Sequence, residues 1–147
     1  ILGVDLPETA APDSFNILPV LLGNKITRPA REATVHHSMT GKFAIRKGDW
    51  VLIDSRTGDD NGRMGEPAFL KAERGYTPHS LPGELFNLRE DISQRTNHYA
   101  EQPEIVRELK ALLAKYKSEG RSTPGPALPS DVKIGYFDKI NGIRLSE

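Results

Sequence analysis

The sequence predicts an α+β domain, in which a small antiparallel sheet of three to four strands is packed by one long C-terminal amphipathic helix. Two patterns support this prediction. Short runs of β-branched and aromatic residues, separated by turn residues, indicate strands within 33–55 and 83–91. Apolar residues at helical spacing indicate a helix over about 103–118. A chain of 147 residues is long enough to bury one core.

The first thirty residues contain a short apolar segment, DSFNILPVLLG. Asp13 or Ser14 is expected to cap a helical turn there, and Gly23 to end it. The apolar side chains of this turn have no partner within the segment. We therefore expect them to cover another surface.

The strands are predicted from local patterns. ATVHHS (33–38) has the composition of a strand, and KFAIRKGDWVLIDS (42–55) predicts a hairpin with KGD at its turn. The return run WVLI is entirely apolar, which is typical of a central strand covered on both faces. GELFNLRED (83–91) predicts a further strand after a long polar connection over 54–82.

The helix has clear end signals. Pro103 suits its first position, Glu101 and Glu104 suit its positive end, and Gly120 suits its stop. One face carries the residues expected to pack against the sheet: Ile105, Leu109, Leu112, Leu113 and Tyr116. The tail over 121–147 starts as a Pro/Gly-rich linker, and KIGYFDKINGIRL is expected to pair as a short hairpin with Asn141-Gly142 at its turn.

The composition excludes several classes of function. Twenty basic and twenty acidic residues cancel, so no overall charge favours nucleic acid or an anionic membrane. The absence of cysteine excludes disulfides, thiolate metal sites and cysteine nucleophiles. No apolar run reaches the length of a membrane span. The start resembles no signal peptide and lacks Met, so Ile1 is expected to lie inside a longer polypeptide.

Several stretches, in this order, carry a family resemblance: DSFNILPVLLG, FAIRKGDWVLI, GELFNLRED followed by NHYAEQPEIVRELKALLAKY, and GRSTPG. Together they resemble the C-terminal region of formylglycine-dependent sulfatases of the arylsulfatase type, over about residues 13–125. The resemblance implies that 1–30 ends the preceding catalytic domain or connects to it. It implies further that 31–120 is the C-terminal subdomain and 121–147 a tail.

The same resemblance implies a parent enzyme that hydrolyses aryl or carbohydrate sulfate esters. In that family, formylglycine arises from a C/S-x-P-x-R motif, which this chain lacks. The calcium ligands lie mostly in the missing domain. The chain is therefore expected to hold no catalytic residue and no metal ligand, and to be inactive alone. Its implied partners are its own N-terminal catalytic domain and a sulfated small molecule or glycan, in a periplasmic or extracellular location.

His36, His37 and Lys42 are the candidate substrate-binding residues. Neighbouring residues on a strand point to opposite faces, so the two histidines cannot share one zinc ion without distortion. One interpretation is that one histidine packs in the sheet and the other is exposed. The alternative is that one of them projects from the strand end toward a sulfated substrate, as a cationic or hydrogen-bonding group. Lys42 can contact an anion, as can Arg46 and Lys47, although basic residues at a hairpin turn are usually only solvated.

Other polar residues are expected to be structural. GDDNG (58–62) is similar to a calcium-binding motif of sulfatases but follows the hairpin instead of preceding it, so a solvated turn is predicted. Trp50 is expected in the core, and His79 and His98 on the surface. The alternative function is a free-standing anionic-glycan-binding or structural module without catalysis. That alternative predicts a basic cleft around Arg46 and Lys47.

Overall fold

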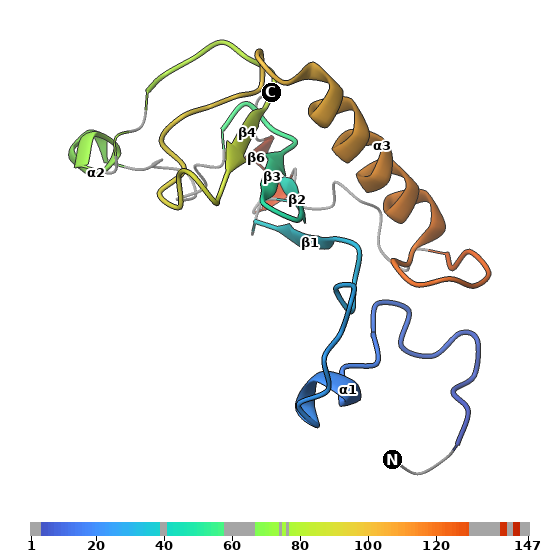
Figure 1. The fold of residues 1–147 in the computed structure, drawn as a ribbon. Coiled ribbons are helices and arrows are strands. Elements are labelled where there is room, and N and C mark those ends of the chain that lie inside the picture. Colours follow the sequence, from blue (N-terminus) through green and yellow to red (C-terminus); the bar gives the residue numbers. More distant parts are fainter. Residues whose placement is uncertain are drawn as a thin grey trace.

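The structure is a computed structural model that describes residues 4–38, 41–57, 67–73, 75, 77–129, 139–140 and 143–144. It confirms the α+β prediction. A four-stranded antiparallel sheet, in the order β1-β2-β3-β4, is covered on one face by the long helix α3 (Figure 1). The strands are β1 (Thr34–His37), β2 (Phe43–Lys47), β3 (Trp50–Ile53) and β4 (Glu84–Asn87).

The hairpin of β2 and β3 forms as predicted. Lys47 pairs with Trp50 across the turn, where Gly48 adopts a φ of 59° that glycine tolerates best. β3 lies between β2 and β4, and its neighbouring residues Val51 and Leu52 are 5% and 0% exposed. Because they point to opposite faces, β3 is covered on both faces, as its apolar sequence predicts.

Helix α3 (Pro103–Glu119) supplies one side of the core. It ends at Gly120, whose φ is 63°, so the predicted stop is confirmed. The predicted apolar stripe is confirmed at its centre, with Val106 added, whereas Ile105 and Leu112 lie partly buried at its margin. The core is formed by residues of both layers: Val106, Leu109, Leu113 and Tyr116 from α3, and Ile45, Leu52 and Leu85 from the sheet.

Helix α1 (Leu18–Leu21) forms, but its predicted cap is wrong. The Leu18 N–H donates to Oδ1 of Asn16 at 3.0 Å, and neither Asp13 nor Ser14 contributes a cap. Asp13 lies too far before the first turn. Its Oδ1 instead accepts hydrogen bonds from the backbone N–H and the hydroxyl of Ser122, at 2.9 and 2.7 Å. Gly23, with a φ of 73°, follows the helix as predicted.

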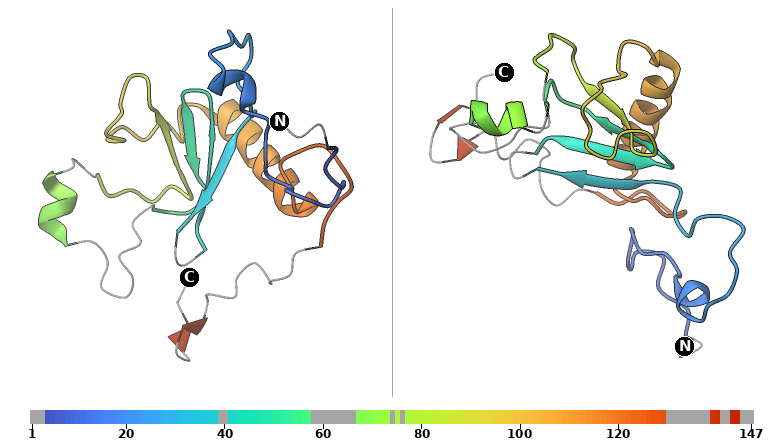
Figure 2. Two further views of the ribbon diagram at one scale, coloured as in Figure 1. Left: turned by 90° about the horizontal axis from the view of Figure 1, so that it is seen from below. Right: turned by 60° about the vertical axis from the view of Figure 1, so that its left-hand side comes forward.

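Arg121 fastens the N-terminal segment to the loop after α3. Its residue is only 5% exposed, and its guanidinium donates to the carbonyl oxygens of Glu8, Thr123 and Pro126 at 2.9–3.1 Å. The Thr123 hydroxyl donates to the carbonyl of Pro12 at 2.6 Å. Two segments more than a hundred residues apart are thereby bound together. Beyond this attachment, α1 projects away from the sheet in both figures (Figures 1 and 2).

Two further elements lie outside the sheet. Helix α2 (Ala68–Glu73) occurs within the predicted polar connection and was not expected. β5 (Lys139–Ile140) and β6 (Ile143–Arg144) form an antiparallel pair, which confirms the pairing of the predicted terminal hairpin. The turn Asn141-Gly142 and the GDDNG segment lie outside the described residues, so those predictions stay predictions.

Candidate substrate-binding face

The second face of the sheet, opposite α3, carries a set of polar side chains. In the register of the sheet, His36 pairs with Ala44 and Thr34 with Arg46. Directly paired residues of antiparallel strands share a face, and so do residues two apart on one strand, so His36, Ala44 and Arg46 lie on the same face. Ile45, between Ala44 and Arg46, packs in the core against α3, so this shared face is the second face. His37 pairs with Phe43, on the α3 face. The predicted divergence of the two histidines is therefore confirmed.

All three predicted site residues nevertheless border one hollow beside the connection between β1 and β2. We call it the hairpin concavity; it has a volume of about 390 Å³. Its lining includes His36, His37, Ser38, Lys42, Arg46 and Gln94. None of the described residues that line it is acidic. The chemistry of this hollow thus suits an anion.

The turn at this hollow is held by local hydrogen bonds. The Ser38 hydroxyl accepts from the backbone N–H of Lys42 at 3.1 Å, and the backbone N–H of Ser38 donates to the Lys42 carbonyl at 2.9 Å. The His37 ring lies 2.9 Å, through Nδ1, from the Ser38 carbonyl and 5.9 Å from the Phe43 ring centroid. These contacts fix the backbone from which the predicted binding side chains extend.

Lys47 belongs to a different environment. Its ammonium group lies 2.8 Å from the carboxylate of Glu108 and 3.0 Å from that of Glu32. The hydrogen bonds to Glu108 and then Glu32 raise the pKa of Lys47 to about 12. Lys47 thus ties the sheet to α3, while Arg46 points to the other face. Arg46 and Lys47 therefore do not line the single basic cleft that the alternative function predicts.

The predicted surface position of His79 is wrong. Its side chain is 14% exposed, and Nε2 lies 3.1 Å from Oε1 of Glu84, whose side chain is 5% exposed. Nδ1 accepts a hydrogen bond from the backbone N–H of Leu81 at 3.2 Å. Because Nδ1 accepts, Nε2 carries the proton and donates to the carboxylate. A buried carboxylate requires such a donor, which explains why this histidine lies inside.

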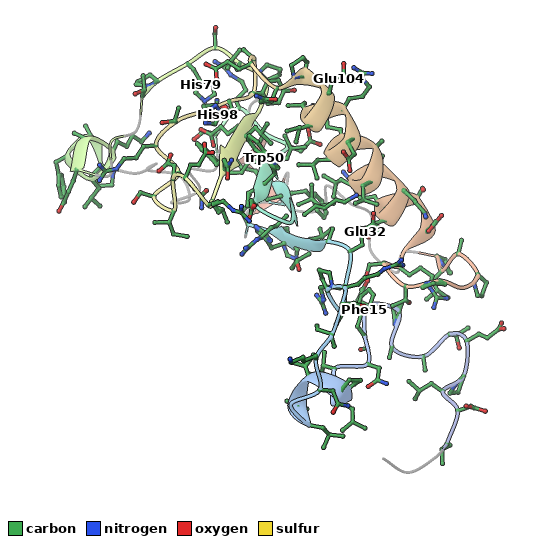
Figure 3. The ribbon with its side chains drawn as sticks, in the orientation of Figure 1. Phe15, Glu32, Trp50, His79, His98 and Glu104 are labelled. Carbon is green, nitrogen blue, oxygen red and sulfur yellow. The ribbon has the colours of Figure 1, made fainter. Side chains whose placement is uncertain are left out.

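His98 is also more buried than predicted. Its side chain is 22% exposed, and its ring packs edge-on against Trp50 with centroids 5.9 Å apart. Nδ1 lies 2.9 Å from a carboxylate oxygen of Glu101, and the backbone N–H donates to the carbonyl of Leu85. Trp50, half-buried, packs against the core as predicted. Figure 3 shows both histidines and Trp50 around β4.

A second hollow, which we call the loop concavity, adjoins β4. Its volume is also about 390 Å³, and its lining includes His79, Glu84, Phe86, Gln94, Arg95 and Asn97. Asn97 fixes the surroundings of His79: its Oδ1 accepts from the backbone N–H groups of Leu85 and Tyr99 at 3.0 Å. Gln94 borders both concavities, which are therefore neighbours.

Within the described residues, no three His, Cys, Asp or Glu side chains come together as potential metal ligands. Among the helices of the described chain, none has the length and apolarity to cross a bilayer.

Comparison with known proteins identifies the chain's relatives, although no protein-family model matches it. The chain is 36% identical over 121 residues to N-acetylgalactosamine-6-O-sulfatase of Bacteroides thetaiotaomicron, covering 80% of the chain and 21% of that relative. This chain is homologous to part of a sulfatase. A solved structure described with the metabolism of multiple glycosaminoglycans by Bacteroides thetaiotaomicron matches with a TM-score of 0.57 and 34% identity. That match covers 77% of this chain and 22% of the other.

This chain thus spans about a fifth of the length of these relatives, which is consistent with the predicted C-terminal domain. Sequence reasoning missed two of its residues at the concavities, His79 and Gln94. The five-residue spacing of His79 and Glu84 carries no signal on a loop followed by a strand. Gln94 lies in a turn that follows Asp91. An aspartate side chain often accepts hydrogen bonds from backbone N–H groups a few residues downstream, so Asp91 is a signal from which this turn could have been predicted.

Proposed function

We propose that this chain is the C-terminal portion of a sulfatase, a sulfuric ester hydrolase acting on aryl or carbohydrate sulfates. In this proposal it completes the fold of the parent enzyme and contributes to the rim of its substrate pocket. The observation that carries the proposal is the 36% identity to N-acetylgalactosamine-6-O-sulfatase over 121 residues. In this proposal the parent's nucleophile and calcium lie in the catalytic domain, and this chain lacks the C/S-x-P-x-R motif from which the nucleophile would arise.

The exposed apolar residues around α1 support the role in completing the fold. Leu21 and Leu22 are 73% and 67% exposed, and Ile17, Val20 and Ile26 are 47–51% exposed. A contiguous apolar segment of this kind is costly in water and marks a contact surface. Because the chain matches only 21% of its relative, the missing part of the parent is the occupant we propose for this surface.

The hairpin concavity supports the second role. Lys42, Arg46 and His36 surround a hollow without acidic lining among the described residues, and guanidinium and ammonium groups suit sulfate. In our proposal His36 and Lys42 contact the sulfated substrate from the rim. His37, which points toward α3 and is held at Ser38, shapes the turn and borders the same hollow.

The test is sulfate release by the parent protein. Ion chromatography should detect sulfate from N-acetylgalactosamine 6-sulfate or from an aryl sulfate with the parent, and none with the 147-residue chain alone. His36→Ala and Lys42→Ala should each raise KM about 3- to 10-fold, as expected for one lost polar contact. Lys115→Ala, which removes an exposed charge from α3, is the matched control. A parent that releases no sulfate from any ester, or an active isolated chain, would contradict the proposal.

A further inference from the structure

Strand β1 leaves one edge of the sheet open. It pairs with β2 on one side, and no other described strand lies beside it (Figure 2). The backbone N–H of Ser38 donates to the Lys42 carbonyl, so in this antiparallel ladder every second residue of β1 bonds to β2. The backbone N–H and C=O groups of Val35 and His37 therefore point to the open edge.

This edge lacks the features by which native proteins usually prevent pairing with another strand. Those features are charged side chains, proline, a bulge or a covering segment. β1 has the sequence Thr-Val-His-His, with no Lys, Asp, Glu or Pro. Its register with β2 runs without a bulge from Thr34 to His37. An edge of this kind is a template to which a further strand can add.

A hollow lies along β1 on the α3 face of the sheet. We call it the edge hollow; its volume is about 380 Å³. Helix α3 lies over β2 and β3, so space remains beside β1. The apolar residues of its lining are Ala33, Val35, Phe43, Leu113, Tyr116 and Pro129. Val35 and Phe43 are only partly buried against the core. Apolar side chains of an added strand would complete their burial.

The rim of the edge hollow carries positive charge. Lys117 and Arg31 border it, and neither forms an ion pair with a carboxylate of the described residues. The Lys117 ammonium lies 4.5 Å from the centroid of the Phe43 ring, and Arg31 reaches Asp13 only at its carbonyl oxygen, at 3.5 Å. Asp13 is the one acidic residue of the described lining, and its Oδ1 already accepts two hydrogen bonds from Ser122. The rim therefore favours a carboxylate from the added strand.

We propose that a strand from the part of the parent outside this chain pairs with β1 and extends the sheet. Its apolar side chains enter the edge hollow, and an aspartate or glutamate of that strand pairs with Lys117 and Arg31. The chain matches only 21% of its relative, so most of the parent is available to supply the strand.

The position of the hollow also favours this source. Asp13 and Arg31, which border the hollow, lie on either side of α1 in the sequence, so the hollow and the exposed apolar surface around α1 belong to one segment. The inference rests on the proposed function, and it adds a second contact surface between this chain and the rest of the parent.

Residue-resolved hydrogen–deuterium exchange of the parent tests the pairing. The amides of Thr34 and His36 bond to β2, whereas those of Val35 and His37 can bond only to the added strand. In the parent we expect all four amides to exchange slowly. In the 147-residue chain, Val35 and His37 should exchange at least about 10-fold faster than in the parent. Protected amides in α3 serve as the control that the isolated chain is folded.

Lys117→Glu tests the charge of the rim. In the parent it should speed exchange at Val35 and His37 about 10-fold or more, because it places a carboxylate against that of the added strand. Lys115→Glu makes the same change at an exposed position of α3 outside the edge hollow. It should alter these exchange rates by less than about 2-fold.

The proposal is overturned if Val35 and His37 exchange as fast in the parent as in the isolated chain. It is also overturned if the isolated chain already protects them, or if protection in the parent is lost on about 100-fold dilution, because this chain itself or a second copy then covers β1. Protected amides in a parent that releases no sulfate would contradict the proposed function alone. Sulfate release with unprotected amides would contradict the strand pairing alone.

Discussion

The apolar surface of α1 gives a prediction in which one substitution has opposite consequences in two proteins. Leu21 is 73% exposed in this chain. Full burial of a leucine side chain contributes about 1.5–3 kcal/mol, so covering the exposed three quarters in the parent contributes about 1–2 kcal/mol. Leu21→Asp would forfeit that contribution and bury an unpaired carboxylate, which costs further. We expect a total loss of about 3 kcal/mol or more in the parent.

In the 147-residue chain the same substitution replaces one exposed side chain by another. Its free energy of unfolding should change by less than about 0.5 kcal/mol, and the chain should become less prone to associate. Urea unfolding of both proteins, followed by circular dichroism and tryptophan fluorescence, measures the two values. Leu113→Ala is the control: Leu113 is 1% exposed, and its truncation should cost about 2–5 kcal/mol in both proteins.

The reasoning is refuted if Leu21→Asp leaves the unfolding of the parent unchanged while Leu113→Ala destabilises it. That result would mean that α1 stays in water in the parent, and that its apolar residues have another role. The reasoning is also refuted if Leu21→Asp lowers the free energy of unfolding of the isolated chain by several kcal/mol, because Leu21 would then already pack within the chain.

Three further predictions concern the scaffold. The backbone φ of Gly120 is 63°, and a Cβ at this position would lie 2.2 Å from the carbonyl oxygen of Leu128. Gly120→Ala should therefore lower the free energy of unfolding in urea by about 2–4 kcal/mol. An unchanged free energy of unfolding would contradict this close approach. Asp13→Ala removes two hydrogen bonds to Ser122 and should cost about 1–2 kcal/mol, with faster amide exchange at Ser122 but not in α3. The pKa of Lys47 is raised from 10.5 to about 12, so its ion pairs stabilise fully below pH 10.5, and the stabilisation is lost as the pH rises through 12. Lys47→Met should abolish this loss of stability at alkaline pH. Near pH 7 it should lower the free energy of unfolding by only about 0.5–1 kcal/mol, because solvent screens the ion pairs. If stability depends on pH in the same way in the variant as in the wild type, the pairs do not form.

The sheet and α3 were predictable because local patterns and tertiary packing agree. The strand WVLI is apolar on both faces and lies inside the sheet, and the Gly48 and Gly120 signals mark a turn and a helix end where the backbone requires positive φ. Helix α2 could not be predicted from the sequence in the same way. Its six residues make fewer than two turns, too few for an apolar period to show.

The errors share a physical cause, which is that tertiary contacts decide where these side chains lie. Asp13 looks like a helix cap, but Ser122 and Arg121 hold its segment from beyond α3. His79 looks solvated, yet it lies beside a buried carboxylate, and Asn97 holds the strand next to it. Composition and spacing cannot reveal pairings of this kind. The divergence of His36 and His37 was predictable because it depends only on the two-residue period of a strand. Both side chains are exposed, however, so the interpretation that one of them packs in the sheet is wrong.

The central claim, that this chain is the C-terminal portion of a sulfatase, is tested most directly by sequencing the coding DNA upstream of the codon for Ile1. The account predicts an open reading frame that encodes a catalytic domain, with a Cys or Ser in the context x-Pro-x-Arg and paired aspartates after an apolar strand. A start codon or a signal peptide immediately upstream of Ile1 would contradict it, and a free-standing glycan-binding module would then explain the same structure better.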